Sequence, residues 1–203
     1  MKLYFAKGAC SLASRIIINE TKLPCEFESV DLAGKKTESG ANFYSINPKG
    51  SVPVLITDDN ETLTENAVIM QYLANAAHAD NLLPAPGSFK HYRVLEWLNF
   101  VATELHKGFS PLFNPAMPLD TKEKITIPVL KGKLGYVNTQ LEHSEFLTGE
   151  TFTLPDAYLF VMTSWAGYFK MNLADWPHLS RHFMALRART AIQKSLDQEG
   201  LHF

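Results

Sequence analysis

The 203-residue sequence predicts an α/β domain with the element order β-α-β-α-β-β-α, followed by an all-helical domain. Short apolar segments alternate with helical patterns over residues 1–79. The stretch DNLLPAPGS at residues 80–88 cannot continue a helix, which indicates a linker. Over residues 89–203 apolar side chains recur only at the three- and four-residue spacing of helices. We therefore expect two domains joined by this linker.

The elements of the first domain are short. Runs rich in aromatic and β-branched residues predict strands at Leu3 to Phe5, Cys25 to Val30, Val54 to Thr57 and Thr62 to Leu63. The last two bracket the turn Asp58-Asp59-Asn60, which is typical of a hairpin. Helical spacing predicts one helix from Ser11 to Glu20 and another that begins after Glu65. The polar segment from Leu32 to Ser45 should contain at most a short helix.

The second domain should contain five longer helices. They are expected at residues 90–109, Lys122 to Leu141, Leu154 to Phe169, Pro177 to Arg187 and Ala191 to Gln198. Thr153-Leu154-Pro155-Asp156 fits a capping box, with Thr153 as N-cap and Asp156 reaching back from the third helical position. Proline is tolerated there because its missing N–H would have no partner in the first turn. The motif is structural.

Composition excludes several classes of protein. The net charge is −2 with both signs scattered, which argues against nucleic acid or a membrane as a partner. Two cysteines, Cys10 and Cys25, do not make a secreted disulfide framework, and neither lies at metal-ligand spacing. The sequence shows no signal peptide and no apolar run long enough for a membrane span. We expect a soluble, cytoplasmic protein without a metal.

Cys10 is the first candidate for chemistry. It follows Gly8-Ala9 at a strand-to-helix turn, where the helix dipole and unpaired N–H groups favour a thiolate. A small buried side chain is the competing interpretation, and it is the better one for Cys25.

Two loops of the first domain could bind an extended ligand. In Asn47-Pro48-Lys49-Gly50-Ser51-Val52-Pro53, a cis Val52-Pro53 bond would turn the Val52 backbone outward to pair with a peptide. Thr64-Glu65-Asn66 precedes a helix, whose N-terminus suits a carboxylate while Glu65 suits an ammonium group. The pair fits the zwitterionic end of an amino acid, although ordinary capping by Thr64 or Asn66 also explains it.

A polar stripe runs along the first helix of the second domain. Glu96, Asn99, Thr103 and His106 recur every three or four residues, offset from the apolar face. Because a solvated face is usually richer in lysine and glutamate, the stripe indicates a crevice or a subunit contact, with plain surface as the alternative.

With these features the chain resembles bacterial glutathione transferases of the beta class. The residues that carry the resemblance are MKLYFAKGACSLAS, DLAGKKTESG, INPKGSVPVL, LTENAVIMQYL, EWLNFVATELHKGFSPLF and FTLPDAYLF. INPKG-x-VPVL followed by LTE is highly specific, and Cys10 with Lys35 points to the class.

The resemblance implies a thioredoxin-like first domain that binds glutathione as co-substrate, with no cofactor. Val52 would pair with the cysteinyl part, Glu65 and Asn66 would hold the γ-glutamyl end, and Lys35 the glycine carboxylate. Family members are homodimers, in which further contacts come from Asn99, Thr103, Glu104, Leu105 and His106, some of them from the partner subunit. Two departures are Asn66, where Ser or Gly is commoner, and Arg15, where relatives may carry His and any acid–base role is in doubt.

The expected reaction is attack by a glutathione thiolate on a hydrophobic electrophile, a detoxification chemistry. Catalytic candidates are Cys10, Ser11 and His106, and acceptor-site candidates are Phe109, Phe113 and Trp165. Cys10 could also form a mixed disulfide with glutathione. The alternatives are a monothiol glutaredoxin-like reductase, because no C-x-x-C motif is present, and a non-enzymatic partner or ligand-binding protein on the same fold.

Overall fold

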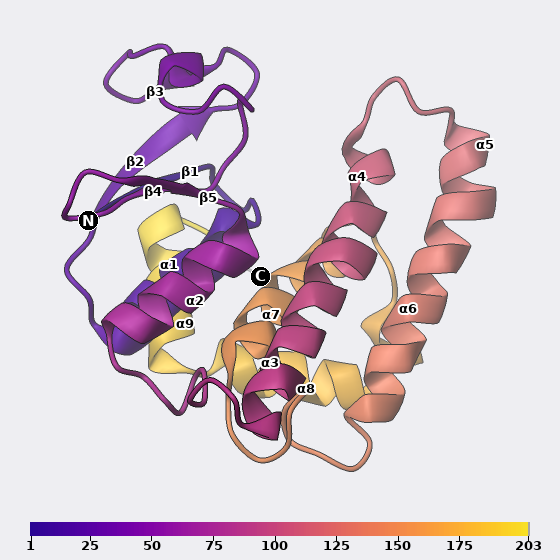
Figure 1. Cartoon of the computed structure of the whole chain (residues 1–203). Coiled ribbons are helices and arrows are strands. Elements are labelled where there is room, and N and C mark those ends of the chain that lie inside the picture. The colour runs from indigo at the N-terminus through magenta and orange to yellow at the C-terminus, as the bar shows by residue number, and fades with distance from the viewer. Residues whose placement is uncertain (203) are drawn as a thin grey trace. The chain divides into compact units, whose positions relative to one another are not determined.

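The computed structural model describes residues 1–202 (Figure 1). Its internal contacts divide the chain into two compact units. Unit 1 comprises Met1–Asp80 together with residues 188–202, and unit 2 comprises Asn81–Arg187. The sequence analysis assigned residues 89–203 to one helical domain, so the division differs at the C-terminus.

Unit 1 contains a mixed five-stranded sheet in the order β3-β2-β1-β4-β5. The strands are β1 (Lys2–Phe5), β2 (Glu26–Asp31), β3 (Lys36–Thr37), β4 (Val54–Ile56) and β5 (Thr62–Thr64). β1 pairs in parallel with β2 and antiparallel with β4, and the β4–β5 hairpin is as expected. β3 was not predicted, because two residues are too few to show an alternating pattern. The expected short helix in this segment is a 3-10 turn at Phe43–Ser45.

Three helices of unit 1 gather on one face of the sheet (Figure 1): α1 (Ser11–Thr21), α2 (Asn66–Ala76) and α9 (Thr190–Glu199). α1 is buried from Ser11 to Asn19 and packs against both other helices. Polar side chains link α1 to α9. Asn19 donates to Ser195 and to Gln198, both over 2.8 Å, and Glu20 pairs with Arg189. These bonds explain why α9 belongs with unit 1.

A buried ion pair also joins these two helices. Arg15 is 2% exposed, and its Nε donates to Glu199 Oε1 over 2.9 Å. The other carboxylate oxygen accepts the Gly8 N–H at 2.8 Å, in the loop that leads to Cys10. The guanidinium lies 4.1 Å from the ring centre of Phe5 and 3.8 Å from that of Phe27. Burial lowers the pKa of Arg15 and raises the pKa of Glu199. Arg15 therefore has a structural role in this chain, because its ion pair with Glu199 joins α1 to α9.

Unit 2 is helical. Its segments are α3 (Phe89–Phe100), a π-helix (Val101–His106), α4 (Lys107–Phe113), α5 (Leu119–Thr121), a second π-helix (Lys122–Thr126), α6 (Ile127–Gln140), α7 (Leu154–Tyr168), a 3-10 turn (Leu173–Asp175) and α8 (Pro177–Arg187). The helices predicted at residues 90–109 and 122–141 are present, but each contains π-helical turns. Within residues 1–202, no helix is both long and apolar enough to span a membrane.

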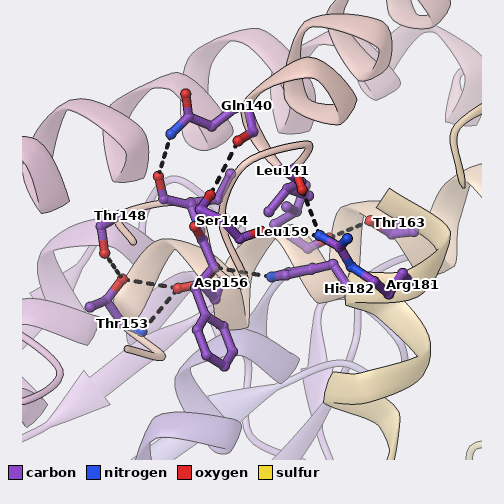
Figure 2. Close-up of polar contacts among 12 residues, drawn as sticks. Gln140, Leu141, Ser144, Thr148, Thr153, Asp156, Leu159, Thr163, Arg181 and His182 are labelled. Carbon is purple, nitrogen blue, oxygen red and sulfur yellow. Dashed lines mark hydrogen bonds and ion pairs between the residues drawn. The ribbon is translucent and has the colours of Figure 1, made fainter. Parts of the chain in front are cut away.

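The predicted capping box is present at the start of α7. Asp156 accepts the Thr153 N–H at 2.9 Å, and both halves of the box are formed. Figure 2 shows that the same carboxylate also bonds to His182, whose Nε2 lies 3.0 Å from Asp156 Oδ1. Asp156 further accepts the Leu147 N–H at 2.9 Å, so one buried side chain organises the helix start.

We expect Glu28 on β2 to make unit 1 sensitive to acid. Glu28 pairs with Lys2 and accepts the Ser39 hydroxyl at 2.6 Å, and these bonds lower its pKa from 4.5 to about 2. A depressed carboxyl pKa stabilises the folded state above the unfolded value, and the gain is lost as the pH falls from about 4.5 to about 2. Glu28→Gln should therefore unfold at a midpoint that varies less with pH across this window. An unchanged pH dependence in urea titrations would contradict this account.

Candidate active site

Cys10 stands where the sequence analysis expected it, at the N-cap of α1. Its side chain is 6% exposed, and Sγ lies 3.5 Å from the carbonyl oxygen of Val52. The Asn66 side chain donates to the Cys10 carbonyl over 3.0 Å and accepts the Ser14 hydroxyl at 2.6 Å. Three segments that are distant in the sequence therefore meet at Cys10.

The Val52 loop has the predicted backbone. The Val52-Pro53 peptide bond is cis. The Asn47 side chain donates to the Ser51 carbonyl over 2.7 Å and accepts the Lys49 N–H at 3.1 Å. Gly50 has φ +61°, and a Cβ there would lie 2.7 Å from the Tyr44 ring, so a larger residue would not fit without a shift.

Glu65 is the N-cap of α2, with φ 70° and ψ 110°. A non-glycine residue with positive φ is uncommon, and such conformations cluster at functional sites. Its Oε1 lies 2.6 Å from Lys49 Nζ, which also donates to Thr64 Oγ1 over 2.9 Å. A cation of this chain therefore stands at the carboxylate predicted to bind an ammonium group. The competing explanation, side-chain capping by Thr64 or Asn66, is not what the structure has, because Glu65 is the cap residue.

Lys35 lies next to the loop that contains Gly50 and Val52. Its Nζ donates to the Gly50 carbonyl over 2.7 Å, and it lies 5.8 Å from the centre of the Tyr44 ring. Lys35 is thus held against the Val52 loop rather than extended into solvent. Ser11 is fully buried, and its hydroxyl donates to the Ala6 carbonyl over 3.3 Å. As a donor to a ligand sulfur, Ser11 would have to give up this bond.

The remaining candidates lie in unit 2. Asn99 and Thr103 are exposed, and Thr103 donates to the Asn99 carbonyl. Glu104 pairs with Lys133 of α6 at 2.8 Å, and Leu105 is completely buried. His106 ends the π-helix, and its Nδ1 lies 2.6 Å from the Tyr158 hydroxyl. Of the predicted stripe, Glu96, Asn99 and Thr103 are thus exposed, and His106 is half-buried.

The three acceptor-site candidates form one aromatic cluster in unit 2. The Trp165 ring centre lies 5.8 Å from Phe109, 4.8 Å from Phe113 and 5.3 Å from His106. Phe169 stacks on Phe109 at 6.1 Å. Phe109 is completely buried, whereas Phe113 is 47% exposed, so the cluster extends from the core to the surface.

Comparison with known proteins identifies the family of this chain. The chain matches the models of the glutathione S-transferase N-terminal domain over residues 1–75 and C-terminal domain over residues 100–190. It is 43% identical over 201 residues to glutathione S-transferase GstA of Escherichia coli O157:H7, an alignment that covers 99% of this chain and 100% of GstA. The chain belongs to the glutathione S-transferase family.

Two similar solved structures indicate the class of this transferase. A sphingomonad glutathione S-transferase complexed with glutathione is 40% identical, with a TM-score of 0.95 over 100% of both chains. The beta class glutathione S-transferase of Sphingomonas chungbukensis is 36% identical, with a TM-score of 0.96 over 100% of both chains. The resemblance to the beta class and the predicted thioredoxin-like fold with a helical domain are thus confirmed, and the chain is an enzyme, a glutathione transferase.

The sequence analysis did not identify several residues around the predicted site of this transferase. Lys49 lies within the motif INPKG, but a lysine before a glycine carries no signal that it pairs with Glu65. Ser14 and Tyr158 sit on buried helix faces, where a polar side chain could only be noticed as an exception to the apolar pattern. Their partners, Asn66 and His106, are 52 residues away in each case.

Proposed function

We propose that unit 1 binds glutathione along one continuous path past Cys10. The observation that carries the proposal is the 3.5 Å separation between Cys10 Sγ and the Val52 carbonyl oxygen. A cysteinyl residue that paired with the Val52 backbone as an added strand would bring its own sulfur next to Cys10. On this proposal the glutathione sulfur lies beside a cysteine at the N-terminus of α1.

The ends of the tripeptide would be recognised by charge. The α2 N-terminus offers backbone N–H groups to the γ-glutamyl carboxylate, and Glu65 offers a carboxylate to the ammonium group. The Lys49–Glu65 pair supports this role, because it shows that a cation can approach the carboxylate. Lys35, which is anchored on Gly50, would bind the glycine carboxylate. The fit of both charged ends to glutathione favours it over a neutral peptide.

We propose two reactions at this site, one of the bound glutathione thiolate and one of the Cys10 thiolate. In conjugation, the glutathione sulfur forms a bond to an electrophilic carbon of a hydrophobic acceptor, and the leaving group departs with the electron pair. In disulfide exchange, the Cys10 thiolate attacks one sulfur of oxidised glutathione, which forms a mixed disulfide and releases the other glutathione as thiolate. Ser11 and His106 are the proposed donors to the sulfur. Asn99, Thr103, Glu104 and Leu105 complete the proposed glutathione contacts, and Phe109, Phe113 and Trp165 the acceptor site.

We further propose that the enzyme is a cytoplasmic homodimer that acts in detoxification. The dimer is supported by large apolar side chains that α3 and α6 expose, namely Phe89, Tyr92, Val129 and Tyr136. Sedimentation that finds only monomers at micromolar concentration would contradict it.

Mass spectrometry tests the role of Cys10. After incubation with oxidised glutathione, the wild type should carry one glutathione that dithiothreitol removes, and Cys10→Ala should carry none. Cys25→Ala, which removes the other cysteine, should still form the adduct. Conjugation of a chlorinated aromatic should persist in Cys10→Ala if disulfide exchange is a separate activity. An adduct that survives Cys10→Ala but not Cys25→Ala would place the redox chemistry at Cys25.

A further inference from the structure

Tyr158 holds the imidazole of His106 through a short hydrogen bond inside unit 2. Tyr158 lies on α7, is 1% exposed, and its hydroxyl is 2.6 Å from His106 Nδ1. The two side chains come from separate helices. They can meet because α7 packs against the π-helix that ends at His106. The bond therefore links a buried side chain to a half-buried one.

His106 is the last residue of the π-helix Val101–His106. The Lys107 N–H donates to the Ala102 carbonyl, five residues back, so this turn holds more residues than an α-helical turn. The extra residue rotates the following side chains around the helix axis. Such π-helical turns frequently occur at functional sites.

A second residue of α7 confines the ring. Trp165 follows Tyr158 by seven residues, which brings both side chains to the same face of α7. The ring centres of Trp165 and His106 are 5.3 Å apart at an interplanar angle of 63°. The His106 imidazole is thus held at Nδ1 by the hydrogen bond to Tyr158, and it packs against the indole ring of Trp165.

We propose that Tyr158 is a positioning residue that selects one tautomer of His106. A phenol O–H is a stronger acid than a neutral imidazole N–H, so the Tyr158 hydroxyl donates to Nδ1 of the neutral ring. The imidazole proton then lies on Nε2. An Nε2–H group is a donor that suits an anionic sulfur, which a bare Nε2 would repel. This inference rests on the proposed function, in which His106 acts on glutathione.

Nitrogen NMR tests the tautomer without measuring activity. In full-length protein labelled with 15N-histidine and saturated with glutathione, the His106 signals are assigned by their loss in His106→Gln. The wild type should show the Nε2–H tautomer above pH 7.5, and Tyr158→Phe should show a mixture. Thr163→Val is the matched control, since it removes a buried hydroxyl of α7 that bonds to Leu159 (Figure 2) and should keep the wild-type signals. An Nδ1–H tautomer in the wild type, or an unchanged tautomer in Tyr158→Phe, would overturn the proposal.

Kinetics of conjugation tests the consequence. Tyr158→Phe should lower kcat about fivefold, as expected for one lost hydrogen bond, and leave KM for glutathione within about twofold. In a His106→Ala background Tyr158→Phe should have no further effect, because it acts through His106. An equal loss in both backgrounds would refute positioning. If His106→Ala keeps the wild-type kcat while the tautomer responds as described, the catalytic role of His106 fails and the role of Tyr158 in fixing the ring stands.

Discussion

Glu65→Ala should weaken glutathione binding strongly in the calorimeter. The variant removes the only side-chain carboxylate at the start of α2, between Thr62 and Ala76, and with it the partner proposed for the ligand's ammonium group. Hydrogen bonds to charged groups contribute about 1.5–3 kcal/mol, so Kd should rise roughly 10- to 100-fold. The titration is done on the full-length wild type and the variant under identical conditions.

Lys49→Met is the matched control for this prediction. It also breaks the 2.6 Å pair with Glu65, but it leaves the carboxylate in place. Because Lys49 competes with the ligand's ammonium, Lys49→Met should bind glutathione at least as tightly as the wild type. A gain of up to about fivefold corresponds to the usual worth of an exposed ion pair. If both variants lose binding equally, the intact pair and not the carboxylate builds the site.

Arg15→Met should cost about 3–5 kcal/mol of unfolding free energy, since it leaves Glu199 buried without its cation. The double variant Arg15→Met/Glu199→Leu should regain most of this loss, because replacing both partners of a buried pair by apolar residues is often nearly neutral. Urea denaturation followed by circular dichroism measures all three proteins.

Arg189→Met provides the comparison within the same helix pair. Arg189 also joins α9 to α1, through Glu20, but its side chain is 35% exposed. Breaking a pair of this exposure should cost about 1 kcal/mol or less. Equal losses from Arg15→Met and Arg189→Met would mean that burial does not set the strength of the Arg15–Glu199 pair.

Local patterns predicted most of the fold. α8 begins at Pro177 and ends at Arg187 as expected, and the Thr153–Asp156 capping box is formed. Each of these depends on neighbours within one or two helical turns, which the sequence displays directly. The cis bond before Pro53 and the place of Cys10 at the N-cap of α1 were also correct, because proline and a strand-to-helix turn restrict the backbone locally.

The features that were missed depend on residues distant in the sequence. α9 was assigned to the helical domain because its apolar spacing says nothing about its partner, and its polar bonds to Arg15 and Asn19 span more than 170 residues. The bond between Tyr158 and His106 also joins two helices. A periodic pattern identifies a buried face but not the element that covers it.

The position of α9 has a consequence for biosynthesis. Unit 2 is one uninterrupted stretch, Asn81–Arg187, whereas unit 1 is made from both ends of the chain. A ribosome therefore finishes unit 2 before it has made Glu199, the residue that neutralises Arg15 and holds the Gly8 N–H. Until Glu199 has been synthesised, Arg15 in the nascent first 80 residues lacks the carboxylate with which it pairs, so unit 1 is begun before unit 2 and completed after it.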